Sequence, residues 1–141
     1  MSFLILDSSA TLAWIYGDEI TETIRSVFDA VADNGALVPA LWRLEVANSL
    51  TMAVRRRRID PNFRHAALAD LALLDITTDQ QTDSYAWMDT LNLADRFQLT
   101  VYDAAYLELA QRRALPLATL DQDLRNAAMA IGVKVLGTEL K

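Results

Sequence analysis

Short apolar runs alternate with longer amphipathic segments along this chain. The first run, Phe3 to Leu6, stops at Asp7, and strand-length apolar runs return over residues 36–38, 115–118 and 133–136. Runs of this length are typical of strands buried on both faces, and their alternation with helical segments indicates parallel pairing. We therefore predict an α/β fold in which a short, mostly parallel central sheet lies between layers of helices.

Apolar positions three and four residues apart predict the helices. They fall over residues 10–16, 18–33, 40–56, 62–74, 82–98, from 103 to about 110, and 123–131. Ile76 is placed in a short edge strand between the fourth and fifth helices. The inward side of the fourth helix is expected to comprise Ala67, Leu68, Leu71 and Leu74. The apolar face of the fifth is expected to comprise Trp87, Met88, Leu91 and Ala94.

Composition narrows the class of protein. With 141 residues, 52% hydrophobic and 23% charged, the chain is expected to form a single globular domain over residues 1–141. It has no cysteine, and a single histidine, His65, argues against histidine-based metal or triad chemistry. The longest uncharged stretch, residues 8–17, is too short to cross a bilayer. No basic region precedes the first apolar run, so we expect no signal peptide and a cytoplasmic protein.

The charged residues give two opposite indications about whether the protein binds nucleic acid. A net charge of −6 opposes phosphate binding, which depends largely on Lys and Arg. Acidic residues gathered round a divalent cation, however, lower the net charge and still create a phosphate site. Arg55 to Arg58 form an unbroken basic run. Such a run is either simply solvated or in contact with nucleic acid or a protein partner, and the sequence leaves both open.

Four acids stand where ligands bind in folds of this class. Asp7 and Asp121 each follow a predicted strand, while Glu45 and Asp103 line or begin helices that follow a strand or an apolar approach. Ligands of open α/β sheets bind beyond the carboxyl ends of the strands. Each acid also has a structural explanation, since Asp7 suits a turn or a helix N-cap and Asp103 suits a helix N-terminus. Ser8 and Ser9 are predicted to cap the first helix.

Glu45 lies on a predicted helical stripe with apolar neighbours. The stripe comprises Leu41, Leu44, Glu45, Asn48 and Met52. A buried carboxylate needs a partner, and Arg43, the nearest arginine in sequence, falls on a different side of the helix. No lysine stands near any of the four acids. Carboxylates gathered without cationic partners repel one another unless a cation neutralises them, and Mg²⁺ or Mn²⁺ suits an all-oxygen site. The reaction that such a site serves is phosphodiester hydrolysis.

Four short motifs in sequence give the chain a family resemblance. They are Leu6-Asp7-Ser8-Ser9, Leu44-Glu45-Val46-Ala47-Asn48, Thr100-Val101-Tyr102-Asp103-Ala104-Ala105-Tyr106 and Ala118-Thr119-Leu120-Asp121-Gln122-Asp123-Leu124. With these motifs the chain resembles PIN-domain ribonucleases, and most closely the VapC-like toxins of toxin–antitoxin pairs. The resemblance implies a PIN-like three-layer α/β/α sandwich.

The resemblance also implies site residues and partners. It places a metal quartet for Mg²⁺, or Mn²⁺, on Asp7, Glu45, Asp103 and Asp121, with supporting polar positions at Ser8, Asn48 and Thr119. Asp123 either joins the acidic cluster or caps the last helix, and we favour the cap. The implied protein is an endoribonuclease, the homodimeric toxin of a type II pair, inhibited by a small antitoxin. The antitoxin's helix would lie in an apolar groove, for which Trp14, Tyr16 and Trp42 are candidates unless they pack in the core.

Other functions fit parts of the pattern. A Mg²⁺-binding phosphoacceptor receiver domain needs paired acids after its first strand and a late lysine, whereas two serines follow Asp7 and the two lysines, Lys134 and Lys141, are poorly placed. A haloacid-dehalogenase phosphatase needs an aspartate where Ser9 stands. A catalytically silent PIN scaffold that binds RNA or protein would have the same fold and no RNase activity.

Overall fold

Five short strands form one parallel sheet at the centre of the molecule. The computed structural model describes residues 4–18 and 20–138, so Phe3, the first residue of the predicted run, lies outside the described residues. The strands are β1 (Leu4–Leu6), β2 (Ala36–Val38), β3 (Ile76–Thr78), β4 (Leu117–Ala118) and β5 (Val135–Leu136). Their order is β3-β2-β1-β4-β5, and all four pairings are parallel. The predicted sheet is confirmed, and it is all-parallel rather than mostly so.

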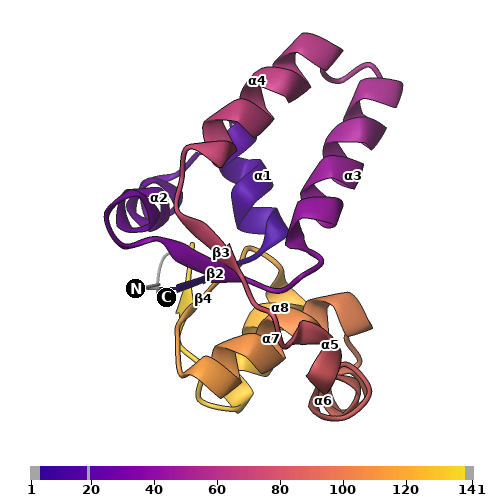
Figure 1. The fold of residues 1–141 in the computed structure, drawn as a ribbon. Helices are drawn as coiled ribbons and strands as arrows, with labels where there is room; N and C mark the ends of the chain where they lie inside the picture. The colour runs from indigo at the N-terminus through magenta and orange to yellow at the C-terminus, as the bar shows by residue number, and fades with distance from the viewer. Residues whose placement is uncertain (1–3, 19, 139–141) are drawn as a thin grey trace.

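Helices cover both faces of this sheet (Figure 1). On one side lie α1 (Ser8–Tyr16), α2 (Glu22–Asn34), α3 (Trp42–Arg55) and α4 (Pro61–Ala72). On the other side lie α5 (Thr82–Tyr85), α6 (Asp89–Phe97), α7 (Val101–Arg113) and α8 (Gln122–Ala130). The three-layer α/β arrangement is therefore the one expected. Within the described ranges, no helix has the length and apolar character needed to span a membrane.

The strands of this sheet are short and lie mainly in the buried core. Every residue of β1, β2 and β4 is buried, as continuous apolar runs predict for strands covered on both faces. Gly35, which ends α2 with φ +78°, is required at the turn into β2, because a Cβ there would stand 2.8 Å from the carbonyl oxygen of Asp75. The carboxyl ends of the central strands β1 and β4 lie side by side, which places the residues after them together.

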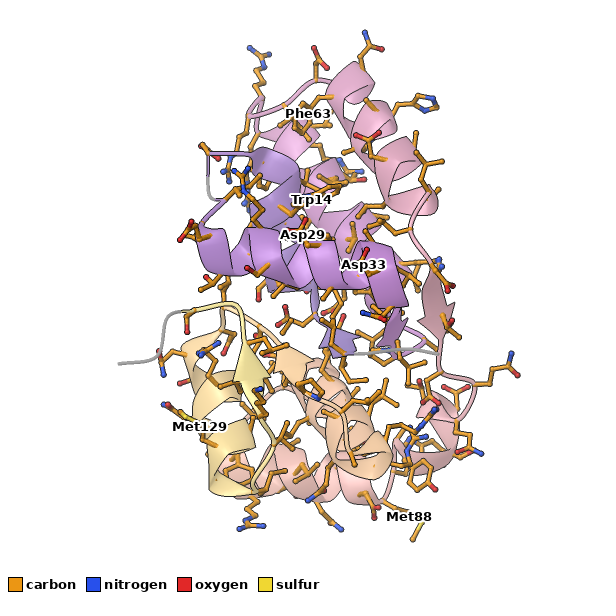
Figure 2. The ribbon with its side chains drawn as sticks, turned by 90° about the vertical axis from the view of Figure 1, so that its left-hand side faces the viewer. Trp14, Asp29, Asp33, Phe63, Met88 and Met129 are labelled. Atoms are coloured by element: carbon orange, nitrogen blue, oxygen red, sulfur yellow. The ribbon has the colours of Figure 1, made fainter. Side chains whose placement is uncertain are left out.

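The segment 82–98 differs from its prediction. It breaks into two helices before Asp89, and the predicted apolar face is largely wrong, because Trp87 is 90% exposed and Met88, labelled in Figure 2, is 66% exposed. The buried side of α6 carries Thr90, Leu93 and Ala94, so of the predicted face only Ala94 is buried. The predicted helix is interrupted over residues 86–88, so the helical spacing no longer places residues on either side of the break on one face.

Fewer residues of α4 are buried than its apolar pattern predicts. Of the four residues expected to face inward, Leu71 is buried, whereas Leu68 is 38% exposed. The reason is that α4 packs mainly against α3 rather than beneath a second layer (Figure 1). A helix covered on one narrow side buries fewer residues than its apolar pattern suggests.

Candidate active site

Asp7 is a buried carboxylate at the end of the central strand β1. It is 4% exposed, and its side chain accepts hydrogen bonds from the Ser9 hydroxyl at 2.7 and 2.9 Å and from the Ala10 amide at 2.9 Å. Asp7 is therefore the N-cap of α1, as the structural alternative had it, and the predicted capping by Ser8 and Ser9 is wrong. Capping uses one carboxylate oxygen, so it does not prevent Asp7 from binding a ligand as well.

Ser9 and Thr119 connect the ends of β1 and β4. The Ser9 hydroxyl accepts a hydrogen bond from the Leu120 amide at 2.9 Å and lies 3.4 Å from the Thr119 hydroxyl. The Thr119 hydroxyl in turn accepts from the Asp121 amide at 3.1 Å. This chain of contacts fixes the spacing between Asp7 and Asp121. Ser9 contacts the Asp7 carboxylate directly and Thr119 lies beside Ser9, while the supporting roles predicted for Thr119 and Ser8 stay predictions.

The N-cap of the last helix is Asp121 and not Asp123. Asp121 is the N-cap of α8, and its Oδ1 accepts from the Leu124 amide at 2.9 Å. Asp123, which we expected to be the cap, is an exposed residue of the first turn. Its negative charge contributes to raising the pKa of Asp103, so it belongs to the acidic surroundings of the site.

Asp103 lies in the first turn of α7, at the centre of the acidic residues. The helix begins at Val101, with Thr100 as its cap. The pKa of Asp103 is raised from its ordinary value, first by burial and then by the negative charges of Asp121 and Glu45. The charge of Asp103 also helps to raise the pKa of Asp7, after the larger effect of burial. The charges of Glu45 and Asp121 thus act on Asp103, and the charge of Asp103 acts on Asp7.

Glu45 has a tyrosine as its partner. The Tyr106 hydroxyl donates a hydrogen bond to Glu45 Oε1 at 2.6 Å. Glu45 does not lie on a buried apolar stripe as expected, because two residues of that stripe reach solvent. Leu44 is 74% exposed, and Asn48 is also exposed. This face of α3 opens towards solvent and the other acids. Asn48 lies about one turn after Glu45 on that face, and its supporting role stays a prediction.

Arg43 does not neutralise Glu45. Its guanidinium donates to the Thr78 hydroxyl and to the Ile76 carbonyl on the edge strand β3. The sequence placed Arg43 on a different side of the helix, and this is confirmed.

Tyr106 belongs to the third sequence motif, but the motif predicts no role for it. It is 1% exposed and lies three residues after Asp103, so both project from the same side of α7. Burial and the Glu45 carboxylate raise the pKa of Tyr106 well above its ordinary value, so it stays protonated and donates at any working pH. The signal that could have found it was this spacing of three from an acid at the start of a helix.

Arg125 is a second residue that was missed. It is 7% exposed and donates from Nη1 to the carbonyls of Thr119 at 2.7 Å and Leu136 at 3.2 Å. It therefore holds the ends of β4 and β5 together directly behind the site. Burial lowers its pKa, while the charge of Asp7 acts in the opposite direction. A buried arginine that binds carbonyls carries no sequence pattern, because its partners are backbone atoms.

The donor chemistry of these residues fits a divalent cation. Among residues 4–18 and 20–138, no ion pair involves any of the four acids, and burial together with the charges of Asp121 and Glu45 raises the pKa of Asp103. Carboxylate oxygens are the ligands that Mg²⁺ and Mn²⁺ prefer. In the same ranges, however, no three His, Asp or Glu side chains are arranged to hold an ion as they stand. To bind an ion, the carboxylates would have to turn towards one another. Repulsion between their charges opposes this movement, and the positive charge of the ion favours it.

Asp7→Asn is expected to stabilise the protein in the presence of a chelator. Burial raises the pKa of Asp7 to about 6 from 3.8, so at pH 7.5 the folded protein carries a buried charge. Asparagine keeps the capping oxygen and removes that charge, so the free energy of unfolding should rise by about 1 to 3 kcal/mol. Denaturant unfolding of both proteins in EDTA measures the difference.

The pH dependence of that difference has a defined sign. A carboxyl with a raised pKa in the folded state takes up its proton there first, so its contribution is most favourable at low pH and is lost as the pH rises through about 6. The advantage of Asp7→Asn should therefore shrink between pH 7.5 and pH 5. An advantage that grows on acidification would contradict the assignment of a raised pKa.

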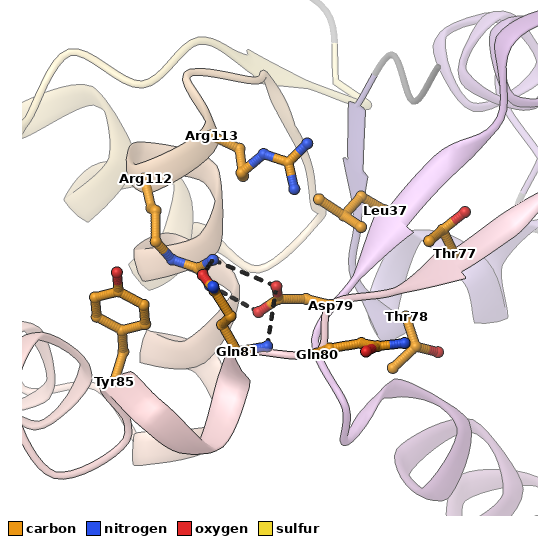
Figure 3. Close-up of a pocket in the computed structure, with 9 residues that line it drawn as sticks. All are labelled: Leu37, Thr77, Thr78, Asp79, Gln80, Gln81, Tyr85, Arg112 and Arg113. Carbon is orange, nitrogen blue, oxygen red and sulfur yellow. Dashed lines mark hydrogen bonds and ion pairs between the residues drawn. The ribbon is translucent and has the colours of Figure 1, made fainter.

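A pocket of about 600 Å³ lies away from the acids and does not form part of this site. Figure 3 shows that its main charged side chain, Arg112, already binds Asp79, with Nη2 and Oδ2 2.7 Å apart. The Arg112 Nε also lies 2.7 Å from Glu108 Oε2, and its guanidinium lies over the Tyr85 ring. A pocket whose arginine is satisfied by two carboxylates offers little to a ligand, and we interpret it as structural.

Comparisons with known proteins agree with this architecture. A model of the PIN domain family matches residues 4–129. A similar solved structure, described as the crystal structure of PAE2754 from Pyrobaculum aerophilum, shares 22% sequence identity at a TM-score of 0.62. That comparison covers 95% of this chain and 90% of the other, and at this identity it shows the fold alone. No curated protein matches the sequence significantly.

Proposed function

Because the chain belongs to the PIN domain family, whose members are generally nucleases, we propose that it is a metal-dependent endoribonuclease acting as a single domain. The observation that carries the proposal is the electrostatic convergence of Glu45, Asp121 and Asp7 with Asp103. These acids come from four separate elements, and no described cation is paired with them. Helix capping accounts for Asp7 and Asp121 individually, but it gives no reason for all four to gather.

The proposed mechanism assigns each residue a task. A divalent cation at such a site neutralises phosphate charge and lowers the pKa of the attacking water. Asp7, Asp103 and Asp121 would hold the cation, while Glu45 completes the site or orients the water. Ser9 and Thr119 fix the orientation of the Asp7 carboxylate through their hydroxyls.

Tyr106→Phe is expected to lower both metal affinity and cleavage rate by about 10- to 100-fold. Phenylalanine keeps the buried ring and removes the hydroxyl that fixes Glu45 Oε1. Isothermal titration calorimetry with Mn²⁺ measures the metal affinity and requires no RNA cleavage. Tyr16→Phe is the matched control, because the Tyr16 ring stacks on Phe63 far from the acids. Unchanged Mn²⁺ affinity in Tyr106→Phe would leave Tyr106 with a packing role alone.

We further propose that the nuclease is the homodimeric, cytoplasmic toxin of a type II toxin–antitoxin pair. An apolar groove of about 390 Å³ between α3 and α4 is a suitable place for an antitoxin helix. Trp42 lines it, although most of this side chain is buried and its Nε1 donates to the Thr11 hydroxyl at 3.1 Å. Trp14 and Tyr16 are not part of this groove, because they stack on Phe28 and Phe63 respectively.

One experiment tests the proposed function directly. RNA ends are sequenced after induced expression of the wild type and of Asp7→Asn in the same host. New ends that accumulate only with the wild type support an endoribonuclease, and growth arrest limited to the wild type supports the toxin. The purified protein should cut single-stranded RNA in Mg²⁺ and stop on addition of EDTA.

A second candidate is a catalytically silent PIN scaffold that binds RNA or protein. It is favoured by one observation, that the described acids are not arranged to hold an ion as they stand. RNA binding without cleavage in Mg²⁺ or Mn²⁺ would identify it. The receiver-domain alternative has no comparable support, since the family model that matches is the PIN domain and Asp7 has no neighbouring acid.

A further inference from the structure

Four consecutive exposed arginines lie at the end of α3, where it turns into α4. We call Arg55 to Arg58 the arginine tip. It contains four of the thirteen basic residues of a chain whose net charge is −6. Figure 1 shows the α3–α4 connection at the end of the hairpin that is farthest from the sheet. Within the acidic molecule, the tip is thus a concentrated positive charge at the end of a projecting arm.

The tip is aligned with the acidic site along one helix face. Glu45 lies in the first turn of α3, and Arg56 is its C-cap, with an amide that still bonds to the Met52 carbonyl at 3.0 Å. Eleven residues advance a helix by just over three turns, so Glu45 and Arg56 differ by only about 20° around the axis. They are separated by about 16 Å along it. Met52 lies between them on the same face.

The backbone at the tip favours glycine, but the residue there is arginine. Arg57 has φ +60°, in the left-handed region that disfavours residues with a Cβ. Its amide bonds to the Val54 carbonyl at 3.0 Å and that of Arg58 to the Ala53 carbonyl at 2.9 Å, which is the glycine-favouring Schellman ending of a helix. Gln98 and Ala114 end other helices in the same left-handed region, so what distinguishes Arg57 is its charge, which glycine would remove while relieving the strain.

We propose that the arginine tip binds the phosphates of the RNA strand whose scissile bond lies at the acidic site. This inference rests on the proposed function and deepens it. A stacked strand advances about 3.4 Å per nucleotide, so the 16 Å between Glu45 and Arg56 correspond to about five nucleotides, and to fewer in an extended strand. The shared face of α3 forms the track between the two contacts.

RNA fits the arginine tip better than an acidic protein does, because the acidic site lies at the other end of the same face of α3. Phosphate is the group that both the acidic site, with its cation, and the guanidinium groups recognise. The rest of the acidic chain repels RNA, so a localised positive contact supplies attraction where the net charge does not. Arg58 lies over the Tyr16 ring at 4.0 Å, which anchors one end of the tip.

The test compares Arg57→Gly and Arg56→Ala with Arg113→Ala. Binding is measured by fluorescence anisotropy on a labelled 20-nucleotide single-stranded RNA of mixed sequence, in an Asp103→Asn background that keeps the RNA intact. Each tip variant should raise Kd by about three- to tenfold near 0.1 M salt and reduce the slope of log K against log salt by about 0.7. Arg113→Ala removes the same charge from an exposed position on α7 and should change neither.

Arg57→Gly separates binding from folding. Because glycine relieves the left-handed strain, its melting temperature should equal or exceed that of the parent protein, so weaker RNA binding cannot be ascribed to unfolding. In the cleavage-competent background, the tip variants should raise KM and leave kcat unchanged. Tip variants that bind RNA as tightly as Arg113→Ala overturn the inference and point to a protein partner. If the wild type cuts RNA regardless, only this inference fails; if it neither binds nor cuts RNA, the proposed function fails with it.

Discussion

Asp103→Asn is expected to reduce RNA cleavage by at least about a thousandfold, while the protein stays folded. Asp103 is the acid on which the charges of Asp121 and Glu45 converge, and asparagine removes its charge without changing its size. Loss of one anionic ligand from a metal site costs several kcal/mol of transition-state stabilisation, which corresponds to three or more powers of ten in rate. Rates on a labelled single-stranded RNA in Mg²⁺ measure the effect.

A second measurement on the same variant needs no turnover. Saturating Mn²⁺ should raise the melting temperature of the wild type by several degrees, because an ion that binds only the folded state stabilises it. Asp103→Asn should lose most of this shift. Asp95→Asn, an exposed acid on α6, is the matched control and should retain both activity and shift. Near-wild-type cleavage by Asp103→Asn would remove Asp103 from the proposed machinery.

The choice of substitution matters at Asp7. This residue caps α1 through the Ala10 amide, so Asp7→Ala would lose about 1 kcal/mol of capping energy as well as a ligand. Asp7→Asn keeps the cap and is expected to be inactive yet more stable in EDTA. The opposite changes in activity and stability would separate a functional carboxylate from a structural one.

Arg112→Met is expected to destabilise the protein by about 3 to 5 kcal/mol, which lowers the melting temperature by about 10 to 20 °C. Arg112 is held between Asp79 and Glu108, and both carboxylates are buried. Methionine fills a similar volume but leaves two buried negative charges without a partner. Calorimetry or denaturant unfolding measures the loss, and Arg113→Met, at the next position and exposed, should cost little.

Two further results would support this explanation. Replacing both carboxylates as well, with Asp79→Asn and Glu108→Gln, should restore part of the stability lost in Arg112→Met, since no charge is then left unpaired. The pH dependence also has a defined sign. Although burial acts to raise it, the pKa of Asp79 is lowered because Arg112, Gln81 and Thr82 bind its charged form. The wild type should therefore lose this stabilisation as the pH falls below about 4, and the variant should not.

Much of the fold followed from local pattern. The apolar runs before Asp7 and around Leu37 became central strands because only a doubly covered strand accommodates an uninterrupted apolar run. The predicted start of the fourth helix at residue 62 is one residue late, because α4 begins at Pro61 with Asp60 as its N-cap. The segment around Trp87 failed because the break at Met88 has no local signal and the two helices then packed independently.

The candidate site also has features that follow from local sequence and features that depend on the tertiary structure. The sequence by itself determined which carboxylates stand after strands and at the first turns of helices, because those positions depend on neighbours in the chain. Tertiary structure alone decided that Glu45 meets Tyr106, that Ser9 links Asp7 to Thr119, and that Arg125 binds carbonyls behind them. The first two contacts join residues 61 and 110 positions apart, across elements whose approach is fixed by the packing of the whole sheet and its helices. No local pattern encodes a distance of that kind.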